Sequence, residues 1–286
     1  MYPSNFDYIR ASSVQEAVAL LQERKDAKLL AGGHSLIPLM KLRTAMVGTL
    51  VDIGRIAELK GVHRPNGTAA IGPLTTHSQV AASTDLPTAL REAAGNIGDL
   101  QVRNRGTIGG NVAHADPASD HPTVLTALGA TFYTTGPSGQ RFIPCENFFT
   151  GFFECSLGIQ DVLTAIEVPV HEKGTSSAYV KMVHPASGYA ILGAAAVVTI
   201  KDGKCTAASV AVGGLTPKAT KAPSVEAALV GQALDEAGIA AAAKAVEDDL
   251  GDDLLGDFYT SAEYRKAMAP VYVQRALKTA AERAMQ

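Results

Sequence analysis

Two short glycine-rich segments carry the residue types best suited to binding a ligand. The first is "AGGHSL" (31–36) and the second is "TIGGN" (107–111). Each places paired glycines beside hydroxyl or amide side chains. Glycine leaves backbone N–H groups uncovered and reaches positive φ, so successive amides can point into one concavity that suits a phosphate. A helix that begins near Leu36 would add its positive end.

The commoner frameworks for a nucleophile or a phosphate are absent. A nucleophile elbow needs G-x-S-x-G, and residues 33–37 read Gly-His-Ser-Leu-Ile, with isoleucine at the place of the second glycine. Neither the P-loop pattern nor the dinucleotide pattern G-x-G-x-x-G occurs. A tight strand-to-helix bend explains either glycine pair alone. The two together, both flanked by polar side chains, favour a nucleotide with a diphosphate.

The second segment has further chemical groups around it. His114, Asp116, Asp120 and His121 follow it with the spacing H-x-D-x-x-x-D-H, which raises the hypothesis of a metal site. We prefer a hydrogen-bonding role, because these residues lie on an expected loop rich in proline and alanine and no thiolate accompanies them. Arg103 and Arg105 precede the segment, and we expect them to brace the loop rather than to steer an anionic ligand.

Hydrophobic periodicity places both segments among alternating strands and helices. The predicted helices are 12–24, which Ser12 or Ser13 can cap, 86–98, about 224–248 and about 261–284. The predicted strands are 27–33, 49–53, 68–74 and 161–170, with hairpins over 130–144 and 194–215, the second turning at Asp202-Gly203. The acidic segment 248–257 reads as a solvated loop. This order predicts a partly parallel α/β front followed by an α+β rear domain.

Composition narrows the class of protein. The chain has 286 residues, 47% hydrophobic and 19% charged, which is typical of a soluble globular protein with one to three domains. A net charge of −3 argues against a nucleic-acid surface. The N-terminus lacks the apolar core of a secretory signal, and the longest apolar run, 190–200, is too short to cross a bilayer.

Three cysteines, Cys145, Cys155 and Cys205, are too widely spaced to ligate an iron–sulfur cluster or zinc within this chain. They suit buried thiols in a reducing compartment. We therefore expect a cytoplasmic protein with no metal site of its own.

The two segments in their full context resemble a known family. "AGGHSLIPLMKLR", "QVRNRGTIGGNVAHADPASD" and the closing "SAEYRKAMAPVYVQRAL" are similar to the FAD-binding medium subunit of the molybdenum hydroxylase (xanthine dehydrogenase) family. The spelling of the first motif is closest to the carbon monoxide dehydrogenase medium chain. The resemblance covers essentially the whole chain.

The resemblance implies an α/β plus α+β fold, namely the two-subdomain FAD-binding fold of the vanillyl-alcohol-oxidase/PCMH type with a C-terminal α+β domain. The implied parts are an N-terminal FAD-binding subdomain (1–55), a second FAD-binding subdomain (56–175) and the C-terminal domain (176–286). FAD would lie between the first two parts, with its flavin ring reaching toward the third.

The resemblance also implies roles for individual residues. The first motif would line the diphosphate, the second would approach it from the other side, and Asp120 would accept a hydrogen bond from a ribose or ribityl hydroxyl. Leu163 would pack near the adenine or the ring edge, with Lys181 and Tyr189 near the flavin ring. The complete implied set is Ala31, Gly32, Gly33, His34, Ser35, Leu36, Thr107, Gly109, Gly110, Asn111, Asp120, Leu163, Lys181 and Tyr189.

By the same resemblance, the chain is an electron-transfer subunit of a heterotrimeric hydroxylase, expected to assemble as a dimer of heterotrimers. An iron–sulfur small subunit with 2Fe–2S clusters and a large subunit with the molybdenum cofactor would be its partners. A quinone, NAD or oxygen would be the acceptor, with possible peripheral association with a membrane acceptor. The chain itself would supply no catalytic acid or base. Carbon monoxide is the leading substrate, and N-heterocycles and aldehydes are alternatives.

Two other functions stay open. A free-standing FAD oxidase is one, with a covalent flavin bond to His34 as in vanillyl-alcohol-oxidase relatives, although few residues would remain for a substrate cap. A non-enzymatic nucleotide-binding module is the other. The chain departs from several relatives at Val183-His184-Pro185, where they have basic residues, and at Gly188, where they have an acidic one. This departure affects the expected surroundings of the flavin edge.

Overall fold

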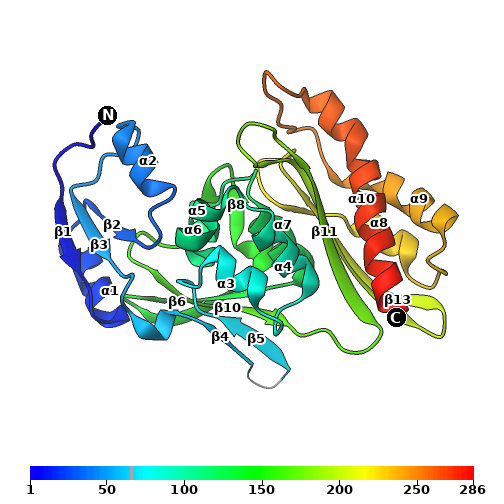
Figure 1. Ribbon diagram of the computed structural model, residues 1–286, viewed down its shortest axis with the longest axis horizontal. Helices are drawn as coiled ribbons and strands as arrows, with labels where there is room; N and C mark the ends of the chain where they lie inside the picture. The colour runs from blue at the N-terminus through cyan, green and yellow to red at the C-terminus, as the bar shows by residue number, and fades with distance from the viewer. Residues whose placement is uncertain (65–66) are drawn as a thin grey trace.

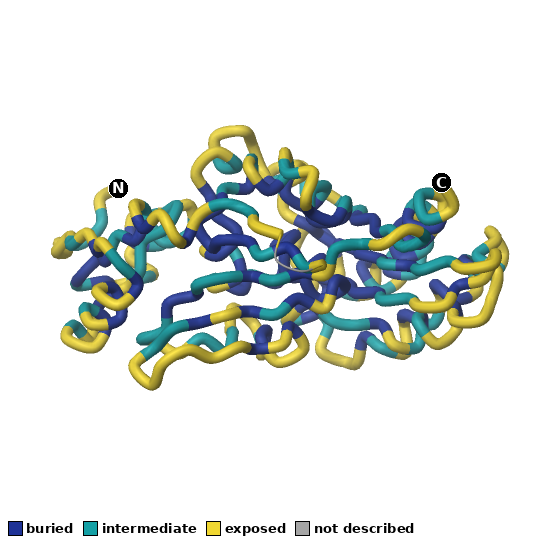
Figure 2. The backbone as a smooth tube through the Cα atoms, turned by 90° about the horizontal axis from the view of Figure 1, so that it is seen from below, coloured by how far each residue is buried: buried dark blue, intermediate teal, exposed yellow. Residues whose placement is uncertain are grey.

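Three larger β-sheets follow one another along the described chain, and the parts that contain them lie in sequence order from one end of the molecule to the other (Figure 1). The structure is a computed structural model that describes residues 1–64 and 67–286. Buried residues follow the strands and the helices that pack on them, whereas the exposed residues gather in the connections and at the two outer ends (Figure 2).

The N-terminal part is a small parallel sheet in the order β1-β3-β2. Asp7 and Ala27 both pair with Thr49, so the two outer strands share one register against the central strand. Ser13 accepts a hydrogen bond from the N–H of Glu16 and caps the first helix, as predicted. The elements are β1 (Asp7–Arg10), α1 (Val14–Glu23), β2 (Ala27–Leu30), α2 (Leu36–Lys41), β3 (Thr49–Asp52) and the 3₁₀ turn η1 (Ala57–Leu59).

The central part is an antiparallel sheet in the order β4-β5-β10-β6-β7. The predicted hairpin is confirmed, because Gly136 pairs with Gly139 at its turn. Phe132 stacks on Phe148 with ring centroids 3.7 Å apart in the core under the helices. The strands are β4 (Val62–His63), β5 (Thr68–Ile71), β6 (Thr131–Gly136), β7 (Gly139–Pro144) and β10 (Val162–Pro169), with η2 (Cys145–Asn147) and the small hairpin β8 (Phe149–Gly151) and β9 (Glu154–Cys155) between them.

Helices of this part lie between its sheet and the C-terminal sheet (Figure 1), and those at 88–95 and 120–128 contact the C-terminal sheet directly. The expected loop around the second glycine segment is wrong in part, because most of residues 100–128 are helical. Asp99 and Thr107 accept hydrogen bonds from the N–H groups of Val102 and Gly110 and start two of these helices. The helices are α3 (His77–Ala82), α4 (Thr88–Gly95), α5 (Leu100–Arg105), α6 (Ile108–His114) and α7 (Asp120–Leu128).

The C-terminal part is an antiparallel sheet in the order β11-β12-β13-β14, covered on one face by its own helices and on the other by the helices of the central part. Ala194 and Ala196 belong to the core on the first face, and Ala195 belongs to the core on the second. Such small side chains let both helical layers approach the sheet. The elements are β11 (Thr175–Val183), β12 (Ala190–Lys201), β13 (Lys204–Gly213), β14 (Thr220–Lys221), α8 (Pro223–Leu229), α9 (Glu236–Lys244), η3 (Ala245–Asp249) and α10 (Ala262–Ala284).

Two predictions for this part need correction. The single helix expected over 224–248 is divided into α8, α9 and η3, and Gly231 in the first break has φ +85°. The acidic segment is more than a solvated loop, because Asp249 accepts hydrogen bonds from the N–H and hydroxyl of Ser224. Asp257 likewise pairs with the buried Arg265. The turn at Asp202-Gly203 and the final helix agree with prediction.

The architecture confirms a mixed fold in which a parallel sheet precedes two antiparallel sheets with helices. The predicted boundary at residue 55 follows β3, and the one at residue 175 coincides with the start of β11. We keep the three ranges as a proposal. In the part of the chain that the structure describes, no helix combines the length and apolar character needed to span a bilayer.

Candidate functional site

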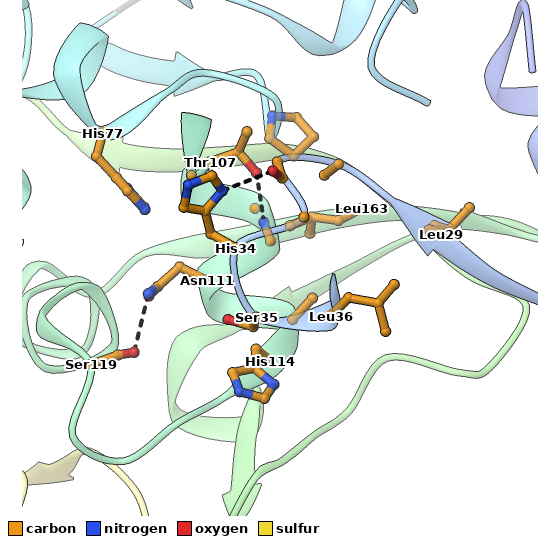
Figure 3. A pocket seen from close by; sticks show the side chains of 18 of the residues that line it. Leu29, His34, Ser35, Leu36, His77, Thr107, Asn111, His114, Ser119 and Leu163 are labelled. Atoms are coloured by element: carbon orange, nitrogen blue, oxygen red, sulfur yellow. Dashed lines mark hydrogen bonds between the residues drawn. The ribbon is translucent and has the colours of Figure 1, made fainter. Parts of the chain in front are cut away.

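A cavity of about 700 Å³ lies where the three parts of the molecule meet. Its walls come from the segment after β2, from α6, from β10 and from the connection between β11 and β12. Figure 3 shows side chains of this lining. The predicted residues that line the cavity are Ala31, Gly32, Gly33, His34, Ser35, Leu36, Thr107, Gly109, Gly110, Asn111, Asp120, Leu163 and Tyr189. Sequence reasoning therefore identified residues that the fold does bring together.

The first glycine segment offers a run of free amides. The backbone N–H groups of residues 32–36 have no acceptor among the residues that the structure describes. Gly33 has φ +77° and Ser35 is helical, with its hydroxyl making no cap bond. Successive N–H groups in left- and right-handed conformations form an anion-binding concavity. This segment keeps the properties of the predicted nest.

The two glycine segments lie against each other. A Cβ at Gly32 would meet the carbonyl oxygen of Arg105 at 2.2 Å, and a Cβ at Gly110 would lie 3.9 Å from that of Ala31. Only glycine at position 32 allows this approach of the two backbones. The convergence of the two segments, separated by about seventy residues in the sequence, is therefore a feature of the fold.

The second segment uses its glycines differently from the first. The N–H groups of Ile108 and Gly109 donate to the carbonyls of Thr75 and Pro73, and that of Gly110 donates to Thr107 Oγ1 at 3.2 Å. The idea that this segment forms a second open nest is therefore wrong. Its glycine serves close packing instead, because a Cβ at Gly109 would meet that of Pro73 at 2.3 Å.

The side-chain oxygen of Asn111 is free to accept a hydrogen bond from a ligand. Its side-chain nitrogen donates to Ser119 Oγ at 3.1 Å, as Figure 3 shows, whereas its Oδ1 is buried without a partner in the described chain. A buried acceptor without a donor is costly, so such an atom points to a missing partner. A ligand hydroxyl is a suitable donor for it.

Two histidines line the cavity here, one within the first segment and one outside it. His34 Nδ1 lies 3.0 Å from the carbonyl oxygen of Gly32, so this nitrogen carries the proton and donates. His77 was not predicted, although it lines the same cavity. Burial, with His34 nearby, lowers the pKa of His77 to about 4. No spacing in the sequence distinguishes His77, since its relation to the cavity depends on the packing of α3.

Asp120 and Lys181 form a buried ion pair at the other end of the cavity. Their side chains are 5% and 2% exposed, and Lys181 Nζ lies 2.9 Å from Asp120 Oδ1. Tyr179 also donates to Asp120 Oδ1, at 2.7 Å. Burial raises the pKa of Asp120, while the lysine ammonium opposes that rise. Tyr179 and Lys181 thus hold the carboxylate of Asp120, which belongs to α7, at the wall of the cavity.

Lys181 acts behind the lining rather than in it. Besides Asp120, its Nζ donates to the carbonyl oxygens of Asn96 at 2.8 Å and Gly188 at 2.7 Å. These three acceptors match the three protons of an ammonium group. The residue therefore fixes the connection that carries Tyr189, and its ammonium is not free to contact a ligand.

The turn between β11 and β12 places Tyr189 at the cavity. His184 Nδ1 accepts hydrogen bonds from the N–H groups of Ala186 and Ser187, and the N–H of His184 donates to the carbonyl of Tyr189 at 2.8 Å. Gly188 has φ +73° and packs against Gly98. The residues in which the sequence departs from relatives thus form one compact turn.

The hypothesised metal residues have separate partners. Asp120 pairs with Lys181, His121 contacts His77, and Asp116 accepts from the N–H of Ala118. Within the described residues, no group of three or more His, Cys, Asp or Glu side chains is arranged to hold a metal.

The two arginines before the second segment differ from each other. Arg103 Nη1 donates to the carbonyls of Ile97 and Gly98, which confirms its bracing role. The side chain of Arg105 makes no such bond in the described chain and lines a second cavity of about 600 Å³, which also borders Gly32 and Gly33. The bracing prediction therefore fails for Arg105.

Comparison with known proteins shows which families the chain matches. The family model described as "FAD binding domain in molybdopterin dehydrogenase" matches residues 4–171, and "CO dehydrogenase flavoprotein C-terminal domain" matches residues 177–280. The chain is 40% identical to the carbon monoxide dehydrogenase medium chain of Hydrogenophaga pseudoflava over 98% of each chain. It is 36% identical to the glyceraldehyde dehydrogenase medium chain of Sulfolobus acidocaldarius, over 98% of this chain and 100% of the relative.

A solved structure matches equally closely. Carbon monoxide dehydrogenase from Hydrogenophaga pseudoflava, in a form that lacks the Mo-pyranopterin moiety of its molybdenum cofactor, contains a chain with a TM-score of 0.94. The sequence identity is 41%, and 99% of each chain is covered. The likeness therefore extends over all three sheets.

Proposed function

Because the chain belongs to the family of FAD-binding medium subunits of the molybdenum hydroxylases, we propose that the cavity at the meeting of its three parts holds FAD for electron relay within a larger oxidoreductase. The observation that carries this proposal is the run of acceptor-less amides at residues 32–36, which opens into that cavity. FAD takes up and releases electrons singly or in pairs and so links one-electron and two-electron partners.

The residues present fit a dinucleotide with a diphosphate. The amides of residues 32–36 would donate to the diphosphate oxygens, which only accept. Asn111 Oδ1 would accept from a ribose or ribityl hydroxyl and so lose its unpaired state. Asp120 keeps acceptor capacity for a second hydroxyl, because a carboxylate offers about four acceptor positions and the side chains that donate to it are those of Tyr179 and Lys181.

The apolar and aromatic lining would orient the two rings. Leu163 on β10 is buried beside the cavity and would pack against the adenine or the edge of the flavin. Tyr189, 44% exposed and held by the turn at 184–189, would cover the flavin. Lys181 would act indirectly, by fixing Gly188 and Asp120. None of these groups needs to transfer a proton, so the chain contributes binding and orientation.

The electron path would involve partner chains. We propose that an iron–sulfur small subunit delivers electrons and that a large subunit holds the molybdenum cofactor at which substrate is oxidised. A dimer of such heterotrimers in the cytoplasm, with an external acceptor such as a quinone, NAD or oxygen, completes the proposal. The relatives support this proposal, because they are named as the medium chains of dehydrogenases, which implies further chains.

For the substrate we propose carbon monoxide first. The support is the 40% identity to a carbon monoxide dehydrogenase chain, but the glyceraldehyde dehydrogenase chain follows at 36%. This small difference agrees with substrate choice residing in another subunit. Relatives with basic residues in place of Val183-His184-Pro185 have a different charge at this turn. We therefore expect the turn to give this chain a different preference for its electron acceptor.

The test is FAD binding by the purified full-length chain or its complex. We expect a flavin absorption spectrum, and release of all flavin from the chain on acid denaturation. A covalent link would leave the colour on the chain and favour the oxidase alternative. A chain that binds no flavin, alone or in its complex, would refute the proposal.

Two variants sharpen this test. Gly33→Val should abolish FAD binding, because it strains the segment at φ +77° and crowds Ile37 at 3.1 Å. Gly203→Val is a matched control, since Gly203 has φ +75° in an open hairpin turn with no atom within 4 Å of its Cβ position. Equal FAD binding by both variants would contradict the role of the first segment.

A further inference from the structure

Two buried histidines outside the predicted site contact each other beside the cavity. His77 is the first residue of α3, and His121 is the second residue of α7. Nδ1 of His77 lies 3.0 Å from Nε2 of His121, and the two side chains belong to residues that are 3% and 0% exposed. Burial keeps the pKa of His77 at about 4 and that of His121 well below its usual value. Both rings are therefore neutral, and each carries one proton.

The single hydrogen bond between the rings allows two proton arrangements. If His77 donates, His121 must carry its proton on Nδ1, which is buried without a partner among the described residues. That would bury an unpaired N–H, which proteins rarely tolerate. If His121 Nε2 donates instead, its Nδ1 is a bare acceptor and no donor is lost. The second arrangement is favoured, and it leaves the proton of His77 on Nε2.

The Nε2–H of His77 faces the cavity. His77 belongs to the lining, its Nδ1 is occupied by His121, and its Nε2 has no acceptor in the described chain. Figure 3 shows its ring directed toward the region of His34 and Asn111. The ring is held in place, because Gly106 packs so closely that a Cβ there would lie 2.7 Å from Nε2. The helix start is fixed as well, by a reciprocal capping box of Thr76 and Gln79.

The nitrogen of His34 that faces away from Gly32 has the opposite character. His34 uses its Nδ1–H on the carbonyl of Gly32, so its Nε2 is a bare acceptor. The cavity wall beside the first glycine segment thus presents a donor from His77 and an acceptor from His34. A fixed, neutral donor suits an oxygen that accepts, without adding a charge that changes at physiological pH.

We propose that His77 binds the dinucleotide by donating its Nε2–H to an acceptor oxygen of the diphosphate or the ribityl chain, and that His121 positions this donor by fixing its tautomer. The inference rests on the proposed function, since it assumes FAD in the cavity. It adds a side-chain donor to a site whose other proposed donors are backbone amides, and it assigns a role to two histidines that no metal or catalytic step uses.

The first experiment compares FAD affinity of the full-length protein and its variants, measured by flavin fluorescence during reconstitution. His77→Leu removes the donor and should weaken FAD binding about tenfold or more, as loss of a hydrogen bond to a charged acceptor does. His77→Gln keeps an N–H donor and should restore most of the affinity. A leucine variant that binds FAD as tightly as the wild type, or a glutamine variant as weak as a folded leucine variant, would overturn the proposal.

The second experiment reads the tautomer directly. Nitrogen NMR of histidine-labelled protein should show His77 protonated on Nε2 and bare on Nδ1, from pH 5 to pH 8. His121→Leu should make both tautomers of His77 visible and weaken FAD binding less than His77→Leu does. A wild-type signal with Nδ1 protonated would overturn the inference. Failure of the proposed function is distinguishable, because it would appear as absent FAD binding in the wild type.

Discussion

Replacing Lys181 by methionine removes the cation from a buried ion pair and leaves its shape largely unchanged. The ammonium lies within hydrogen-bond distance of Asp120, Asn96 and Gly188, and the side chain is 2% exposed. In the variant, the carboxylate of Asp120 would stay buried with only the hydroxyl of Tyr179 as a side-chain donor. Breaking a buried pair in this way costs about 3–5 kcal/mol. We therefore expect Lys181→Met to lower the free energy of unfolding by about that amount.

A double-mutant cycle separates the pair from other effects. Asp120→Asn alone should also destabilise the fold, because it leaves an ammonium group buried among carbonyls. The double variant buries neither charge, so its loss should be smaller than the sum of the single losses by about 2 kcal/mol or more. Far-UV circular dichroism during urea unfolding is a suitable measurement, since the chain has no tryptophan.

The pH dependence gives a further check. In Lys181→Met the pKa of Asp120 would be raised by burial and no longer opposed by the ammonium. The folded state would then bind a proton at a higher pH than the unfolded state, so stability should recover as pH falls from neutral toward 5. A single variant that costs less than about 1 kcal/mol, or strict additivity in the cycle, would refute the buried-pair reasoning.

Three other outcomes follow from the same structure. Gly33→Ala and Gly203→Ala should each lower the free energy of unfolding in urea by about 1–2 kcal/mol, because both glycines have positive φ. Only Gly33→Ala should weaken FAD binding, and weaker FAD binding by both variants would contradict this expectation. Arg265→Met should lower stability by about 1–3 kcal/mol, because its buried guanidinium donates to the carbonyl of Gly214, which would lose its partner, whereas its ion-pair partner Asp257 is 41% exposed. A thermal scan showing no change would contradict this expectation. Since the pKa of His77 is about 4 in the folded state, stability should fall by roughly 3 kcal/mol as pH drops from 6.5 to 4, and His77→Gln should flatten that slope.

Local signals in the sequence were sufficient for much of the fold. The cap at Ser13, the turn at Asp202-Gly203 and the alternating hydrophobic runs each specify an element through contacts between near neighbours, and the structure contains those elements. The helices at 108–114 and 120–128 were missed because glycines and a proline lower helix propensity. Tertiary packing of Gly109 against Pro73 overrides that local preference.

The candidate site was predictable where the residue types themselves are diagnostic. Paired glycines beside serine or asparagine pointed to the lining of one cavity, and the fold assembles it from those residues. The use of each group was not predictable. Whether Gly109 N–H is free depends on Pro73, and whether Lys181 is free depends on Asp120, sixty-one residues away. His77 gave no sequence signal, since its partner His121 is forty-four residues distant.

The unequal use of amides by the two glycine segments bears on when the cofactor enters. In the second glycine segment, the N–H groups of Ile108 and Gly109 are hydrogen-bonded within the protein and need no ligand. The N–H groups of residues 32–36, by contrast, have no acceptor in the described chain, so solvent must bind them before the cofactor does. Binding of the cofactor would then replace bound water in a site that is already folded, and the chain would not need the cofactor in order to fold. The apoprotein should therefore be a folded intermediate in assembly. Exchange of the backbone hydrogens of residues 32–36 should slow when the cofactor binds.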